Sequence, residues 1–410
     1  MQIQKSSIVS YAVFVFALGI VLINLVSLIF PSLIITLIDE TVDSNPYELG
    51  TWAIPVIVAN IAILIFGILY YTKRLPNVVK NGINFILNFE VSRNVATIVV
   101  VGIVFGYVGL GFEDLAVDES KSLADFNRVK DEVENWPFGK GSSELFNLHV
   151  KNFLLKSSQF LFQNWRIVPF IVSISLVLLT YFFTVELTKK RFAGLVAMTV
   201  FLSSYTFQIF DTTASYENSW ALLYLLSLYL IFKKWFLSPI SYVASIFSKP
   251  LTIAYFPLTI FFLFLVDIPR RKKLFVLLSY GIIAIVAFVG IVGLEAELGI
   301  GVPTRNFTFD YDDFWSSFTI WSFQLRYDFL FLLFILPLIV ALFLISRKGI
   351  SHANAALMLI AGATIAMPLV AALSGYNLHP YRYIALIDFF AIGVGTLLIR
   401  RNQAACLNTV

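Results

Sequence analysis

The stretch "GLGFEDLAVDES", residues 109–120, ends an apolar segment with four carboxylates, at positions 113, 114, 118 and 119. Residues 94–112 are apolar and long enough to cross the ~30 Å hydrocarbon core of a bilayer as a helix. Because charged side chains are costly inside hydrocarbon, the acids mark the point where this helix leaves the membrane. The stretch therefore predicts a transmembrane helix with a negatively charged end.

The composition of the chain also indicates a membrane protein. Of its 410 residues, 59% are hydrophobic and 13% are charged, whereas about a quarter of the residues in soluble domains are charged. The single cysteine excludes an internal disulfide. The net charge of +4 comes from basic residues scattered between apolar runs rather than gathered on one polar face, so we expect no nucleic-acid partner.

Apolar runs of spanning length recur along the chain and predict an all-α fold. One further apolar stretch, 239–266, is interrupted by "SKP", and because Pro250 disfavours helix at Lys249 we expect a hairpin of two short helices there. With this hairpin the prediction is a polytopic membrane protein of about twelve transmembrane helices. The other runs lie at 7–38, 53–72, 94–112, 167–187, 192–210, 219–232, 274–293, 328–346, 353–374 and 384–399.

Basic residues predict the orientation of these spans. Lys and Arg gather in alternate loops, such as 189–191, 233–234 and 270–273, and short loops rich in them stay in the cytosol. We therefore expect cytosolic N and C termini and an active face outside, in a prokaryotic cell membrane. The predicted parts are a two-span extension with a cytosolic in-plane segment (1–93), a core (94–293), and an outer loop with three C-terminal spans (294–410).

The longest polar insertion, 113–166, follows the third span on the outer side. Within it, "KSLADFNRVKDEVENW" (121–136) and the stretch 146–165 have apolar residues at steps of three and four. This spacing predicts amphipathic helices that lie in the plane of the headgroups.

Polar residues that could take part in catalysis or binding lie at the outer ends of the predicted spans. This arrangement of carboxylates and cations suits sugar transfer from a polyprenyl-phosphate donor, whose tail sits in lipid while its phosphate and sugar reach the interface. A carboxylate would take the proton of the acceptor hydroxyl, and cations would hold the departing phosphate on the opposite face of the sugar, which gives single displacement with inversion. The candidate catalytic acids are Glu113, Asp114 and Asp211, and the candidate substrate-binding residues are His149, Lys249, His379, Tyr381, Arg382 and Glu217.

The run "RIVPFIVSISLVLLTYFFTVELTKKRFAGLVAMTVFLSSYTFQIFDTTASYENSWALLYLLSLYLIFKKW", residues 166–235, resembles a segment of GT-C glycosyltransferases related to protein O-mannosyltransferases and the lipid A aminoarabinose transferase. "SYVASIFSKPLTIAYFPL" (241–258) is similar to the hairpin that follows in that family. "GFEDLAVDES" (111–120) falls where the family has an acidic pair. "LFNLHVKNFLL" (145–155) falls where it has a His-Pro-Pro segment, although this chain lacks those prolines.

The resemblance implies a GT-C-like fold and roles for particular residues. Asp114 or Glu113 would be the base or would orient the acceptor, with Asp211 as a second acidic contact. Arg382 lies outside the matched stretch, but a forked guanidinium suits phosphate, so we expect Lys249 and Arg382 to clamp the phosphate. This requires Asp114 and both cations to share one pocket. The partners would be the polyprenyl-phosphate sugar donor, membrane lipids and an acceptor glycan, lipid or protein. Since some GT-C relatives use metal, His149 and His379 could also help to bind a divalent cation.

Other interpretations remain open at this stage. The chain could be a non-catalytic subunit or a lipid-binding partner on the same scaffold, or a transporter. Asp118 and Glu119 could cap a helix or be solvated, and Asp211 could cap the helix that follows it. Lys249 could simply extend its amine to the headgroups. Asp388, inside the last apolar run, is either functional or hydrogen-bonded to a neighbouring helix.

Overall fold

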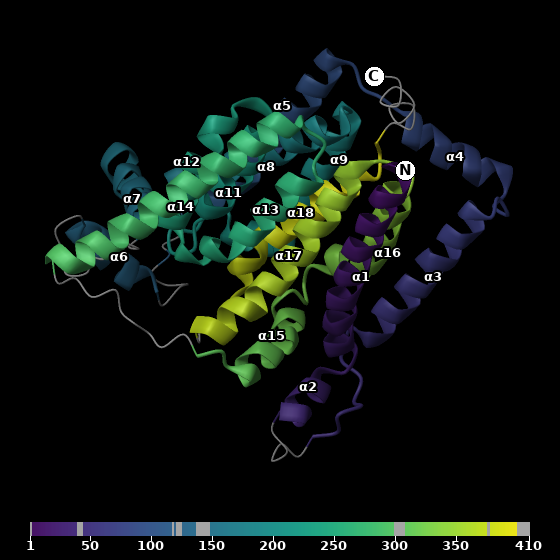
Figure 1. Ribbon diagram of the computed structural model, residues 1–410, viewed down its shortest axis with the longest axis horizontal. Coiled ribbons are helices and arrows are strands. Elements are labelled where there is room, and N and C mark those ends of the chain that lie inside the picture. Colours follow the sequence, from purple (N-terminus) through teal and green to yellow (C-terminus); the bar gives the residue numbers. More distant parts are fainter. Residues whose placement is uncertain are drawn as a thin grey trace.

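The computed structural model describes residues 2–38, 44–116, 119, 125–136, 148–298, 308–374 and 378–399. These residues form eighteen α-helices and a few 3-10 turns, with no strand among them, which confirms the predicted all-α class (Figure 1). Among the described residues, six helices are long and apolar enough to cross a membrane, and they indicate a multi-pass integral membrane protein. They are α1 (Gln2–Ile29), α3 (Ala53–Tyr71), α5 (Arg93–Asp114), α8 (Ile167–Thr188), α16 (Phe329–Ser346) and α17 (Ser351–Ser374).

The remaining apolar helices are shorter or less uniform in composition. The predicted break at Lys249–Pro250 between two short helices is confirmed, because α12 ends at Ser248, Lys249 is extended, and Pro250 begins the turn η3. These helices are α9 (Arg191–Leu202), α11 (Ser219–Lys233), α12 (Ser238–Ser248), α13 (Phe256–Leu265), α14 (Arg270–Leu298) and α18 (Ile384–Thr396), with the 3-10 turns η2 (Trp235–Leu237) and η3 (Pro250–Tyr255).

Two runs that were expected to be single spans are each divided into two helices. The run 7–38 breaks after α1, where Pro31 opens α2 (Pro31–Ile38). In the run 192–210, α9 ends at Leu202 and a separate short helix, α10 (Tyr205–Phe210), follows. Ser204 caps α10 by accepting from the amide of Phe207 at 3.1 Å, and its hydroxyl donates to Asp328 at 2.6 Å. The break is therefore stabilised by a residue distant in sequence.

Helices that do not span flank the bundle at both ends. The two predicted amphipathic stretches form α6 (Phe126–Asn135) and α7 (His149–Phe162), which lie at the left of Figure 1. On the opposite side, at the upper right, lies α4 (Asn77–Asn88). A helix that the sequence did not predict, α15 (Tyr311–Gln324), packs against α2 and against α17.

The spans pack in two groups joined by α18. In one group α1, α2 and α3 contact α15, α16 and α17, and the amide of Asn354 donates to Ser10 at 2.9 Å. In the other group α8 packs against α9 and α11, α12 against α11, and α5 against α8 and α9, while α18 contacts both groups. Inside α18, Asp388 accepts from the hydroxyl of Thr180 on α8 at 2.7 Å, which confirms a hydrogen bond to a neighbouring helix.

Candidate functional site

The turn "DTTASYEN", residues 211–218, connects α10 to α11 and is buried except for the partly exposed Tyr216. A buried polar turn needs hydrogen-bond partners for its main-chain and side-chain atoms. Here the partners come from α5, residue 119, the start of α6, α7, α8 with the residue before it, and α12. The turn is therefore the point at which the segments of this end of the molecule are joined.

Asp211, the first residue of the turn, faces α5. Its Oδ2 accepts from the hydroxyl of Tyr107 at 2.7 Å, and its main-chain oxygen accepts from Ser173 on α8, also at 2.7 Å. Burial raises the pKa of Asp211 to about 7, with a further increase from the charge of Asp114, while the Tyr107 hydrogen bond opposes the shift. Asp211 follows the last residue of α10, whereas Asn218 precedes α11, so the expectation that Asp211 caps α11 is wrong.

Glu119 fixes the middle of the turn. Its two carboxylate oxygens accept from the amides of Ala214 at 2.8 Å and Ser215 at 2.9 Å, and Arg166 lies 3.9 Å away. With 3% of its surface exposed, Glu119 is not solvated, which corrects that alternative of the sequence interpretation. Asp118 lies outside the described residues.

Arg166, just before α8, links the predicted base to the turn. Its guanidinium donates to the main-chain oxygen of Thr212 at 2.9 Å and to the hydroxyl of the same residue at 2.8 Å. It also donates to the main-chain oxygen of Asp114, at the end of α5. The side chains of Asp114 and Glu113 are exposed. Asp114 is therefore held near Asp211 by its backbone, while its carboxylate faces outward.

Lys249 lies on an aromatic surface at the other end of the turn. Its ammonium is 3.7 Å from the ring centroid of Tyr381 and 5.5 Å from that of Trp220, which are cation–π distances. Tyr381 stacks on Tyr216 of the turn, with centroids 4.4 Å apart and planes 18° apart. The Nε of Arg382 lies 3.4 Å from the Tyr381 hydroxyl. The structure therefore brings together three of the predicted binding residues, namely Lys249, Tyr381 and Arg382.

A third cation and one carboxylate complete this group. Lys151 on α7 is buried and donates to the main-chain oxygen of Ser215 at 2.6 Å. Glu217 is buried and accepts from Ser248 at 3.2 Å and from the amide of Ser219. Burial lowers the pKa of Lys249 well below its usual range, the charges of Arg382 and Lys151 lower it further, and Glu217 opposes them. We call Lys151, Lys249 and Arg382 the cation cluster.

The two predicted histidines lie at the edges of the cation cluster. His149 accepts from the indole of Trp136 at 3.2 Å and lies 5.9 Å, ring to ring, from Phe247 on α12. His379 is parallel to Tyr381 at 5.9 Å, and burial with the charge of Arg382 lowers its pKa. Among the described residues no group of three or more His, Cys, Asp or Glu could hold a metal ion, so the divalent cation has no identified site.

Several residues of this region were not among the sequence candidates. Lys151 had a detectable signal, because its spacing from the buried residues Leu155 and Ser158 places it on the inner face of α7. The other residues had no such signal, since their partners are set by tertiary contacts. They are Tyr107, Asp125, Tyr216 and, as a site residue, Glu119; the hydroxyl of Tyr216 donates to Asp125 at 2.6 Å.

Comparisons with known proteins add no family to this description. Neither the protein-family models nor the curated proteins nor the solved structures include a match to this chain. The class defined by the fold is that of an all-α, multi-pass membrane protein.

Proposed function

We propose that the chain is a GT-C-like membrane glycosyltransferase that moves a sugar from a polyprenyl-phosphate donor to an acceptor hydroxyl. In this proposal the chain crosses a prokaryotic cell membrane about twelve times, with both termini in the cytosol and the turn 211–218 outside. The observation that carries the proposal is the turn itself. The cation cluster lies at one end of it, and Asp114 and Asp211 lie at the other.

The cation cluster is suited to the phosphate of the donor. Lys249 and Arg382 lie side by side at an aromatic wall, and Lys151 adds a buried charge close by. A guanidinium presents its donors as a planar fork that matches phosphate oxygens. An anion would also stabilise the charged form of Lys249, which its present surroundings disfavour. We therefore assign Lys249 and Arg382 to the phosphate, with Lys151 as a supporting charge.

Asp114 and Asp211, at the other end of the turn, have different proposed roles. The exposed Asp114 is accessible to an acceptor, so its carboxylate takes the proton as the acceptor oxygen attacks the anomeric carbon. The bond from that carbon to the phosphate oxygen breaks, and its electron pair leaves with the polyprenyl phosphate. Asp211, buried against Tyr107, orients the acceptor or the sugar. Attack and departure on opposite faces invert the anomeric configuration.

The test is transfer by the purified protein in lipid nanodiscs. The donors are a panel of polyprenyl-phosphate hexoses and pentoses labelled in the sugar, the acceptors come from a membrane extract, and release of polyprenyl phosphate is measured. We expect Asp114→Asn to lose at least ~100-fold in rate. The control, Asp312→Asn, alters an exposed acid at the start of α15 and should leave the rate unchanged. Full activity of Asp114→Asn would remove the assignment of the base.

A second candidate function is that of a non-catalytic subunit that binds polyprenyl phosphate. It is favoured by the way in which Glu119, Asp211 and Glu217 are already engaged in hydrogen bonds that hold the turn. The cation cluster alone would suffice for such binding. Saturable binding of polyprenyl phosphate without release from any labelled donor would support this candidate over the enzyme.

A further inference from the structure

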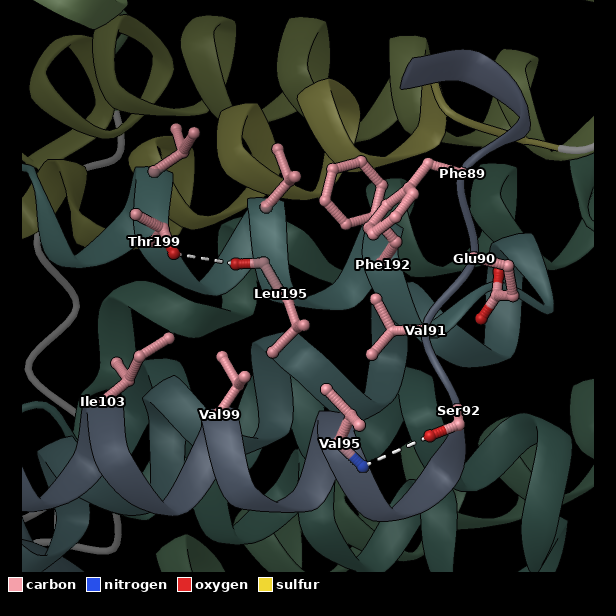
Figure 2. A pocket seen from close by; sticks show the side chains of 12 residues that line it. Phe89, Glu90, Val91, Ser92, Val95, Val99, Ile103, Phe192, Leu195 and Thr199 are labelled. Atoms are coloured by element: carbon pink, nitrogen blue, oxygen red, sulfur yellow. Dashed lines mark hydrogen bonds between the residues drawn. The ribbon is translucent and has the colours of Figure 1, made fainter. Parts of the chain in front are cut away.

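A groove of about 670 Å³ lies between α5 and α9, in the half of α5 that is remote from Asp114 (Figure 2). Val95, Val99 and Ile103 line it from α5, and Leu195 and Val200 line it from α9. The side chains of the two helices point toward one another across the gap in Figure 2. Since α5 is a candidate membrane span, this groove lies at the level of the hydrocarbon core.

The few polar groups in the groove walls are already used. Ser92 accepts from the amide of Val95 at 3.4 Å as the cap of α5, and Thr199 donates to the main-chain oxygen of Leu195 at 2.9 Å. A water molecule needs two to four polar partners in such a site. The walls offer hydrocarbon instead, which suits a chain of methylene groups.

The mouth of the groove is polar and carries both signs of charge. The rings of Phe89 and Phe192 meet edge to face, with centroids 4.9 Å apart, beside Glu90. Glu90 accepts from the amide of Arg191 at 3.1 Å, and the guanidinium of Arg191 donates to the main-chain oxygen of Val91 at 3.4 Å. A guanidinium has five donors, so that single bond uses a small part of its capacity.

A second hollow continues from this mouth along α4. It shares Phe89 and Glu90 with the groove and is lined by Asn81, Asn84 and Asn88. These asparagines recur at steps of three and four and therefore lie along one face of α4. An apolar slot thus opens into a polar, amide-lined surface, which is the pattern of an amphiphile with a neutral headgroup.

We propose that the groove between α5 and α9 binds one acyl chain of a zwitterionic phospholipid, with the phosphate at Arg191 and the amine at Glu90. The groove follows α5 from Val95 to Ile103, a rise of ~12 Å, which accommodates the first part of an acyl chain. The lipid belongs to the leaflet on the side of α4 and is structural. It is separate from the donor of the proposed function, whose phosphate would be bound by Lys249 and Arg382 on the other side of the membrane.

The experiment counts lipids bound to the delipidated, full-length protein by native mass spectrometry. The probe is palmitoyl-oleoyl phosphatidylethanolamine, titrated into the detergent solution. Val99→Trp fills the groove, and Val101→Trp is the matched control, because Val101 is exposed on the same helix and is not part of the groove. Val95→Phe fills the groove with a smaller ring, which covers the case in which the tryptophan variant fails to fold.

For the unmodified protein and Val101→Trp we expect one phosphatidylethanolamine that survives activation sufficient to remove all others. Val99→Trp and Val95→Phe should weaken its binding at least ~10-fold, which corresponds to ~1.4 kcal/mol. Equal retention by the groove variants and the control would overturn the proposal, as would the absence of any retained lipid. In parallel titrations, tighter binding of polyprenyl phosphate in the groove would assign it to the donor tail instead. Equally tight binding of phosphatidylglycerol would refute the role of Glu90.

Discussion

Glu119 is the residue whose removal tests most directly how this end of the molecule is held together. Its carboxylate accepts from two buried amides, at 2.8 and 2.9 Å, and faces Arg166. A hydrogen bond to a charged acceptor contributes about 1.5–3 kcal/mol, and an amide left buried without a partner costs about 1–3 kcal/mol. Because some water would enter the space left by the side chain, we expect Glu119→Ala to lower the free energy of unfolding by ~3 kcal/mol.

The assay is equilibrium unfolding in mixed micelles with increasing dodecyl sulfate, followed by tryptophan fluorescence. The matched control is Glu134→Ala on α6, which removes an exposed carboxylate 3.8 Å from Lys130. Such a surface ion pair contributes at most ~1 kcal/mol. If Glu119→Ala unfolded within ~0.5 kcal/mol of the control, the turn would not depend on this carboxylate, and the reasoning would fail.

Three other changes have expected outcomes. Burial raises the pKa of Asp211 to about 7, so the contribution of its protonated carboxyl to stability is complete below ~pH 4 and is lost as the pH rises through 7. The free energy of unfolding should therefore fall by up to ~4 kcal/mol over that pH range. Asp211→Asn should make the free energy of unfolding less dependent on pH. Gly395→Ala would place a methyl group 2.5 Å from the side-chain methyl carbon of Thr184 on α8, and it should lower the free energy of unfolding by ~1–3 kcal/mol in the same assay. The control, Gly19→Ala, adds its methyl group in open space and should not destabilise the fold. Lys249→Gln should weaken polyprenyl-phosphate binding, measured by scintillation proximity, by ~10–100-fold, and the exposed Lys234→Gln should leave it unchanged.

The extents of several spans could be predicted closely from the sequence, although the runs 7–38 and 192–210 each contain two helices. The predicted run 53–72 is α3 (Ala53–Tyr71), and 167–187 is α8 (Ile167–Thr188). An apolar run must be long enough to cross the bilayer, and charged residues end it because charge is costly inside hydrocarbon. Both the length and the ends of a span can therefore be read from the local sequence. Pro250 likewise predicted the break between α12 and the helix that follows it.

The features that the sequence did not disclose depend on distant partners. The break before α10 is stabilised by Asp328, 124 residues away, and Glu119 binds amides 95 and 96 residues away. Lys249, Tyr381 and Arg382 were predicted one by one from their places at helix ends. The contacts of Lys249 and Arg382 with Tyr381, and of Tyr381 with Tyr216, depend on tertiary packing. A local pattern predicts which residues face the surface, not which of them touch.

The packing of α1 against α16 and α17 has a consequence for biosynthesis. Ser10 meets its partner only when Asn354 has been made, 344 residues later, which at ~5–20 residues per second is a delay of roughly 20–70 s. During that interval α1 must remain in lipid without its final neighbours. Two of its polar side chains have donors that need no other helix, since Asn24 donates to Ile20 and Ser27 donates to Ile23 within α1. These two donors are therefore satisfied before the last third of the chain has been made.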